Sequence, residues 1–163
     1  MVRAFLLLGS NQGDRMAYLE KACHEIGAKA GRLITMSSVY QTAAWGVEDQ
    51  PAFLNQVMVI ETGLSPAQLL TTVLGIETML GRVRSEKWGS RIIDIDILFY
   101  GDQIVETPEL LIPHPRIAER RFALVPMAEV DAEFVHPVFG KNIRMLLREC
   151  KDGLAVTRVI GNR

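Results

Sequence analysis

An alternating run past the middle of the chain restricts the possible folds more than any other feature. Isoleucines alternate with Asp94 and Asp96 in residues 92–100. Successive side chains of a strand point to opposite faces, so the isoleucines share one face and the two acids share the other. The apolar face can pack under helices while the acidic face stays open. The run therefore predicts a sheet with one covered face and one polar face.

The remaining segments are short and follow a regular order. Strands are predicted at residues 2–8, 33–42 and 53–62, in addition to 92–100, and helices at 15–29 and 66–80. Asp14 and Ser65 stand where helix N-caps are expected, and Gly81 stands where a helix would end. The order β-α-β-β-α-β predicts an α+β fold, a ferredoxin-like sandwich in which two helices cover one face of an antiparallel sheet. The other face is then left for loops and ligands.

The last third of the chain is less regular. Gly101 and Asp102 predict a two-residue hairpin turn that returns the chain through residues 103–105. Short helices are predicted at 118–121, 123–130 and 143–150, with a last strand at 156–160. No linker, repeat or low-complexity tract interrupts the sequence. We therefore expect residues 1–163 to form a single domain.

Bulk composition excludes several classes of protein. Lys and Arg number 18 and Asp and Glu number 19, so there is no net field that favours nucleic acid or a membrane surface. The two cysteines, Cys23 and Cys150, are far apart, which argues against a disulfide framework or a zinc knuckle. The apolar run at residues 4–8 is too short for a signal peptide, and no stretch reaches membrane-spanning length. We expect a soluble, cytoplasmic monomer that binds neither nucleic acid nor a membrane.

The paired acids predict a metal site when they are considered with their neighbours. Two carboxylates on one strand face suit Mg²⁺, which takes its remaining ligands from water and phosphate oxygens. Taken alone, Asp94 and Asp96 are better explained as the solvent-exposed polar face of an edge strand. Just before them lie five cationic or stacking residues: Arg82, Arg84, Lys87, Trp88 and Arg91. An acid pair beside an arginine cluster is typical of a site that handles a polyphosphate.

Two further observations limit how phosphate could be held. The chain has no P-loop, no dinucleotide-binding glycine motif and no kinase catalytic loop, so arginines and metal would do the binding. Gly9-Ser10-Asn11 is interpreted as a tight turn from strand to helix that also lines a pocket. His114 lies between two prolines, either as part of a rigid turn or as an oriented ligand contact, and Arg120 and Phe122 follow it.

Eight short motifs occur in a fixed order along the chain. They are Gly9-Ser10-Asn11, Tyr40-Gln41-Thr42, the run 49–55, the run 81–84, the run 88–91, Asp94-Ile95-Asp96, the run 113–116 and the run 119–122. In these motifs the chain resembles the 6-hydroxymethyl-7,8-dihydropterin pyrophosphokinases, enzymes of folate biosynthesis, from the first strand to about residue 130. Some relatives carry tyrosine where Phe53 stands and proline where Ala43 and Ala44 stand.

The resemblance implies a ferredoxin-like fold and a Mg²⁺-dependent transfer of pyrophosphate from ATP to the pterin alcohol. It implies that Asp94 and Asp96 hold two Mg²⁺ ions and that Arg82 and Arg91 act with them in catalysis. The residues implied to bind ATP are Glu77, Arg84, Trp88, His114 and Arg120. The residues implied to bind the pterin are Thr42, Phe53, Asn55 and Phe122, with the two rings stacking on the pterin.

Two other functions stay open on the residues alone. One is a different metal-dependent nucleotidyl or phosphoryl transferase on the same scaffold, which would release ADP rather than AMP if it were an ordinary kinase. The other is a ferredoxin-like ligand-sensing module. Such a module has no need for an acid pair, an arginine loop and a ring-stacking pair together.

Overall fold

The main sheet forms because six segments pair edge to edge. The structure is a computed structural model that describes residues 1–43, 51–82 and 92–159. The strands of the sheet are β1 (Val2–Ser10), β2 (Arg32–Met36), β3 (Tyr40–Thr42), β4 (Phe53–Thr62), β5 (Asp94–Tyr100) and β8 (Thr157–Arg158). Their order is β5-β1-β4-β3-β8, with β2 also pairing with β4, and all the pairings are antiparallel. The predicted mixed fold with an antiparallel sheet is confirmed.

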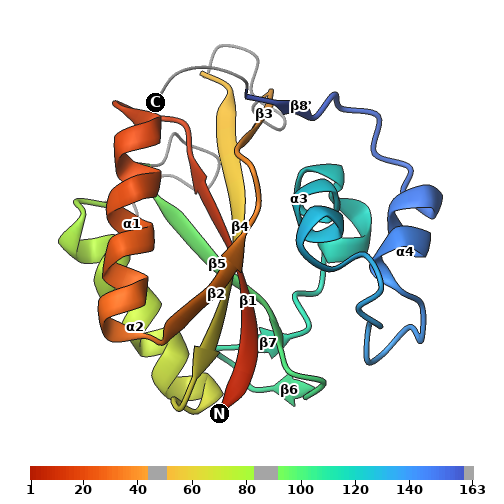
Figure 1. Cartoon of the computed structure of the whole chain (residues 1–163), viewed down its shortest axis with the longest axis horizontal. Helices are drawn as coiled ribbons and strands as arrows, with labels where there is room; N and C mark the ends of the chain where they lie inside the picture. Colours follow the sequence, from red (N-terminus) through yellow and green to blue (C-terminus); the bar gives the residue numbers. More distant parts are fainter. Residues whose placement is uncertain (44–50, 83–91, 160–163) are drawn as a thin grey trace.

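Two helices cover one face of this sheet, as Figure 1 shows. They are α1 (Arg15–Lys29) and α2 (Pro66–Met79). The Asp14 side chain accepts a hydrogen bond from the Ala17 N–H at 3.1 Å, and Ser65 forms a capping box with Gln68, so both predicted N-caps are confirmed. Gly81 has a φ of 102°, a conformation that favours glycine, and it turns the chain just after α2.

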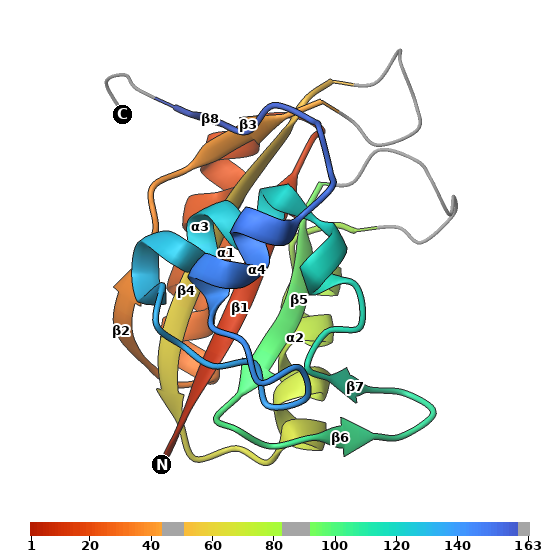
Figure 2. The same cartoon turned by 90° about the vertical axis from the view of Figure 1, so that its right-hand side faces the viewer.

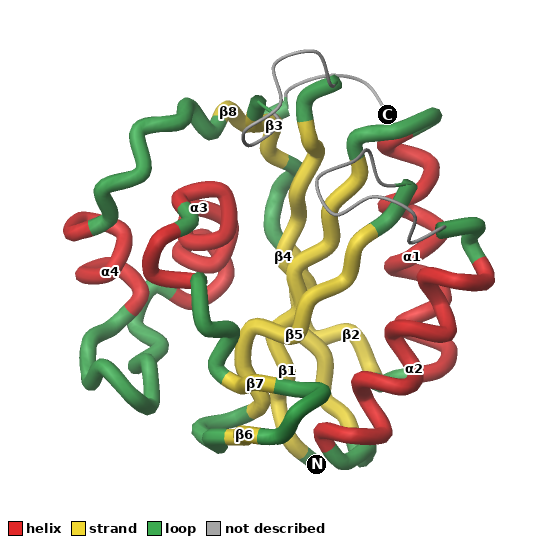
Figure 3. The backbone as a smooth tube through the Cα atoms, turned by 180° about the vertical axis from the view of Figure 1, so that it is seen from behind, coloured by secondary structure: helices red, strands yellow, loops and turns green. Residues whose placement is uncertain are grey.

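The opposite face of the sheet is also covered, which corrects the expectation that it is left for loops and ligands. Three further elements lie over it: the 3₁₀ turn η1 (Ile117–Glu119), α3 (Arg121–Asp131) and α4 (Ile143–Glu149). Figure 3 shows α3 and α4 on the side away from α1 and α2. Phe5 and Leu7 of β1 pack with Leu124 and Met127 of α3 in a second apolar core. The helix faces after residue 120 supply enough apolar surface to build that second layer.

Two local predictions are wrong in detail. The predicted strand 33–42 is divided into β2 and β3, because Ser37 Oγ accepts the Val57 N–H at 2.9 Å in the interval between them. The turn at Gly101 forms, but the segment after it does not return along β5. It makes β6 (Val105–Glu106), which pairs with β7 (Leu111–Ile112) in a separate two-stranded sheet.

The arrangement brings the ends of four strands together at one end of the sheet. β1 and β3 end there, and β4 and β5 begin there (Figure 2). Gly9 of β1 lies opposite Asn55 of β4 on one side and Asp94 of β5 on the other, and Asn55 lies opposite Tyr40 of β3. Directly paired residues share a face.

None of the helices in the described ranges has the length and apolar character needed to cross a bilayer.

Candidate active site

Asp94 and Asp96 lie side by side on the same face of the sheet that α3 covers. Asp94 is paired with Gly9 and Asp96 with Leu7, and both acids are half-buried. The isoleucines that alternate with them point the other way, into the core beneath α1 and α2. The predicted division of this strand into an apolar and an acidic face is therefore confirmed. Consecutive acids on one strand face are roughly 7 Å apart at their Cα atoms.

A cavity of about 610 Å³ opens over these acids. Its walls come from the strand ends, from the segment around η1 and the start of α3, and from the chain after α4. The lining residues that the sequence had singled out are Thr42, Phe53, Asn55, Asp94, Asp96, Arg120 and Phe122. A space of this size is in the range of small-molecule sites. Seven residues from four separate segments thus meet around one cavity.

One wall of the cavity combines aromatic rings with buried polar groups. Asn55 and Thr42 are 4% and 3% exposed, and Phe53 lies directly opposite Thr42 across the β3–β4 pair. Thr42 Oγ1 is buried without a hydrogen-bond partner among the residues that the structure describes. A buried hydroxyl in that state is unfavourable, so a ligand that bonded it would gain affinity. The guanidinium of Arg120 lies 5.6 Å from the centre of the Phe122 ring.

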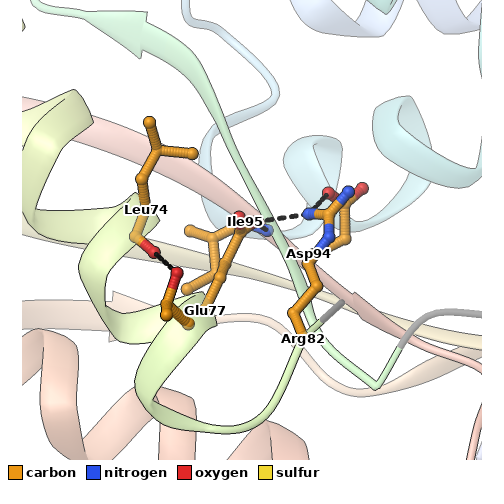
Figure 4. A network of polar contacts seen from close by, with 6 residues as sticks. Leu74, Glu77, Arg82, Asp94 and Ile95 are labelled. Atoms are coloured by element: carbon orange, nitrogen blue, oxygen red, sulfur yellow. Dashed lines mark hydrogen bonds and ion pairs between the residues drawn. The ribbon is translucent and has the colours of Figure 1, made fainter. Parts of the chain in front are cut away.

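Arg82 joins the end of α2 to the acidic strand, as Figure 4 shows. Its Nη1 donates to Glu77 Oε2 at 2.8 Å and to Asp94 Oδ1 at 2.7 Å. The Glu77 side chain is only 2% exposed, and its Oε2 also accepts the Ile95 N–H at 2.7 Å. A buried carboxylate needs such partners because its charge is removed from water. Glu77 therefore holds both Arg82 and the start of β5 in place.

His114 lies at the edge of the same region, after a cis Ile112–Pro113 bond. Its Nδ1 accepts the Arg116 N–H at 3.2 Å, which leaves Nε2 to carry the proton of the neutral ring. The pKa of His114 is lowered to about 4, mainly by burial, with Arg120 and Arg116 acting in the same direction and Asp94 in the opposite one. At neutral pH the ring is an uncharged Nε2–H donor.

Acidification is expected to destabilise the fold through His114. Its folded pKa of about 4 lies below the ordinary histidine pKa of 6.5, so as the pH falls through this window the unfolded chain takes up a proton before the folded chain does. The contribution is fully present above pH 6.5 and is lost by pH 4, and it amounts to about 3 kcal/mol. Urea unfolding at pH 7 and pH 4.5 measures it. His114→Gln should lose less stability over this interval than the wild type does, and an equal loss would contradict the assignment.

The other predicted site residues are distributed unevenly. Glu77, Arg82 and His114 are placed next to the acids but do not line the cavity. Arg84, Trp88 and Arg91 lie outside the described residues. Several residues to which sequence reasoning assigned no role also line the cavity, among them Arg116, Glu119, Glu149, Lys151, Asp152 and Leu154. The first two lie within recognised motifs, whereas nothing in the pattern after residue 130 signalled the last four.

A family model described as 7,8-dihydro-6-hydroxymethylpterin-pyrophosphokinase matches residues 5–132, which include all the cavity residues from the strands and the start of α3. The chain belongs to this family. The pyrophosphokinase membership accounts for the motifs from Gly9 to Phe122. The family model ends at residue 132 and does not include the residues after α4.

Named relatives agree with the family model along nearly the whole chain. A 2-amino-4-hydroxy-6-hydroxymethyldihydropteridine pyrophosphokinase of Methylorubrum extorquens is 44% identical over 160 residues, covering 98% of this chain and 99% of that protein. Proteins of the same name from Aquifex aeolicus and Bacillus subtilis are 39% and 44% identical. They cover 88% and 78% of this chain and 89% and 77% of their own lengths.

Solved structures show a likeness of fold. The Plasmodium falciparum HPPK-DHPS wild type with SDX-DHP has a TM-score of 0.73 at 20% identity and covers 91% of this chain. A second P. falciparum HPPK-DHPS wild-type structure has a TM-score of 0.74 at 18% identity. This pyrophosphokinase spans 43% and 44% of those two chains, so they are considerably longer proteins.

Proposed function

We propose that this pyrophosphokinase transfers the pyrophosphoryl group of ATP to the hydroxymethyl group of 6-hydroxymethyl-7,8-dihydropterin. The products are AMP and the pterin diphosphate, in a step of folate biosynthesis. The family membership supports the reaction, and one observation in the structure supports the site. Two carboxylates and a pair of phenyl rings face the same cavity, next to a buried hydroxyl that has no hydrogen-bond partner in the described parts of the chain. That combination suits a phosphate chain at one end and a flat heterocycle at the other.

Magnesium is proposed as the metal. Within the described ranges no group of three or more His, Cys, Asp or Glu is arranged to hold a metal ion. Two carboxylates are nevertheless a fitting donor set, because Mg²⁺ keeps water and takes substrate phosphate oxygens as further ligands. Asp94 and Asp96 would hold two ions. When bound, the ions would neutralise phosphate charge and polarise the pterin hydroxyl, so that no protein base is needed.

Phe53 and Phe122 would stack on the two sides of the pterin ring. Asn55 and Thr42 would bond its polar edge, and the absence of a partner for Thr42 Oγ1 among the described residues supports this role. The ring would then present its hydroxymethyl group toward Asp94 and Asp96, which line the same cavity. Holding the alcohol in line with the β-phosphorus is the main contribution that such a site can make.

The cationic residues would hold the nucleotide. Arg120 lines the cavity, and neutral His114 offers an Nε2–H donor beside it. Arg82 already contacts Asp94, so its guanidinium would lie beside phosphates held at the acids and would offset charge that develops during transfer. Arg84, Trp88 and Arg91 complete the proposed ATP and catalytic set, and Glu77 would act by supporting Arg82.

Several broader expectations are part of the same proposal. The strand order β5-β1-β4-β3 and the two helices on one face support a ferredoxin-like topology, to which α3, α4 and β8 are added. We expect the chain to work as one domain and as a monomer, in the cytoplasm, with no nucleic-acid or membrane partner.

The lack of a side chain at Gly9 is expected to matter for the pterin. A Cβ at this position would lie 2.8 Å from Asn55 Oδ1 and 3.8 Å from the Phe53 ring. Because real Cβ contacts are not this short, Gly9→Ala should displace the Asn55 amide. We expect pterin affinity to fall on the order of tenfold, as for one lost polar contact. Titration with the pterin measures this, and Gly27→Ala on α1, where a Cβ would meet nothing within 4 Å, serves as the control.

Product analysis tests the function directly. The chain is incubated with ATP, Mg²⁺ and the dihydropterin alcohol, and the nucleotide products are separated. AMP that forms only when the pterin is present supports pyrophosphoryl transfer. ADP would instead identify an ordinary kinase, and the absence of any pterin-dependent nucleotide product would contradict the proposal.

A further inference from the structure

The chain beyond α4 contributes to the cavity although it lies outside the part matched by the family model. After α4 it runs along the outside of the start of α3 and reaches the sheet as β8 beside β3 (Figure 2). Three residues of this stretch line the cavity, Lys151, Asp152 and Leu154, together with Glu149 at the end of α4. The family model ends at residue 132. We call residues 150–158 the C-terminal segment.

Asp152 of this segment caps helix α3 from a distance in sequence. The residue at the N-cap position of α3 is Arg120, which makes no side-chain capping bond. The Arg121 N–H instead donates to Asp152 Oδ2 at 3.1 Å, while Asp152 Oδ1 accepts the Leu154 N–H at 3.0 Å. An aspartate at a helix start satisfies an amide that the helix itself cannot bond, and its charge suits the helix dipole. Asp152 therefore fixes the first turn of α3.

That first turn carries one of the two phenyl rings of the cavity. Phe122 directly follows Arg121, whose amide Asp152 holds, and both Phe122 and Asp152 line the cavity. Leu154 adds an apolar side chain to the same wall. The segment thus holds the helix turn that carries the ring through a hydrogen bond to the backbone of Arg121. It also supplies part of the cavity wall.

The other end of the C-terminal segment is attached to the strand that carries Thr42. Thr157 and Arg158 pair with Gln41 and Tyr40, and the Val159 N–H donates to the Val39 carbonyl at 2.8 Å. The segment therefore bridges α3 and β3, which bring Phe122 and Thr42 to the cavity. A bridge between two walls limits how far they can separate, which keeps the site preorganised.

We infer that the C-terminal segment is part of the pterin site and that Asp152 is a positioning residue for Phe122. The inference rests on the proposed function, because it assigns the pterin to this cavity. Asp152 would act on the ring through the helix start, without bonding the pterin itself. Its loss should weaken pterin binding more than ATP binding, because the segment meets α3 beside Phe122 and joins the strand that carries Thr42.

Three variants and a control test this inference. Asp152→Ala removes the cap, and its KM for the pterin should rise on the order of tenfold, the range that loss of a capping bond allows. Asp152→Asn keeps one acceptor oxygen, which can still accept the Arg121 N–H, but it loses the acceptor for the Leu154 N–H. Its pterin KM should therefore rise less than that of Asp152→Ala. Leu154→Ala should raise the pterin KM several-fold with the cap intact. Asp131→Ala, at the other end of α3, is the matched control.

The readout is the pterin KM compared with the ATP KM for each variant, together with pterin affinity from direct titration. A rise confined to the pterin in Asp152→Ala and Leu154→Ala, with a smaller rise in Asp152→Asn than in Asp152→Ala, supports the inference. Unchanged pterin values in both variants would overturn it, as would equal rises for pterin and ATP. If Asp152→Ala does not fold, Leu154→Ala and Asp152→Asn decide alone. An inactive wild type would refute the proposed function and the inference together. An active wild type, combined with variants whose pterin KM is unchanged, would refute the inference alone.

Discussion

Asp96→Asn is expected to abolish turnover while leaving the fold intact. Asparagine has the size of aspartate and fits the same half-buried position on β5. It lacks the charge that a Mg²⁺ ligand needs, so the cation could no longer be held beside the phosphates. Loss of residues that merely support a metal ligand lowers affinity or activity about 10- to 100-fold, and loss of the ligand itself should exceed that.

The same substitution should not lower stability. Asp94 and Asp96 share a strand face, and like charges that close repel each other. Replacing one of them with a neutral residue removes that repulsion, so Tm should stay constant or rise slightly while AMP formation disappears. Asp102→Asn, an identical exchange in the exposed turn after β5, is the control and should keep wild-type activity. Wild-type turnover in Asp96→Asn would contradict the metal role of the acid pair.

The acid strand and its partners could be predicted because local patterns determine them. Alternation placed the isoleucines and acids of β5 on opposite faces, and the capping residues Asp14 and Ser65 located both main helices. Motif order then identified seven residues that meet at one cavity. In each case a short stretch of sequence contains the whole physical reason for the structure.

The features that were not predicted depend on contacts between distant segments. Helices α3 and α4 cover the second face because their apolar side chains pack against β1 and β5. The sequence of one segment does not show which surface that segment will pack against. The cap of α3 comes from Asp152, 31 residues along the chain from Arg121, so no local capping pattern exists. The break between β2 and β3 likewise depends on Ser37 and its partner Val57 on β4.

Arg82→Ala should lower the rate far more than it weakens ATP binding. Removing a guanidinium that stabilises a phosphoryl transition state lowers kcat on the order of 10³-fold. ATP keeps its other contacts, so its Kd should change by less than about tenfold. Rapid-quench measurement of AMP formation and nucleotide titration separate the two quantities. An unchanged rate would remove Arg82 from catalysis.

The structure adds a complication that the experiment must resolve. Arg82 is also a partner of Glu77, whose side chain is 2% exposed, so Arg82→Ala leaves a buried carboxylate without this cation. Breaking a buried pair in this way costs about 3 kcal/mol, and a distorted β5 could mimic a catalytic defect. The double variant Glu77→Gln/Arg82→Ala separates the two effects, because neutral glutamine can still accept the Ile95 N–H without needing a cation.

We expect the double variant to recover most of the lost stability and none of the lost rate. Glu77→Gln alone is the matched control, in which Arg82 still reaches Asp94. If the double variant regained activity together with stability, Arg82 would be a structural partner of Glu77 and not a participant in the transfer. If stability returns and the rate stays low, the guanidinium acts at the phosphates, and Glu77 serves to hold it there.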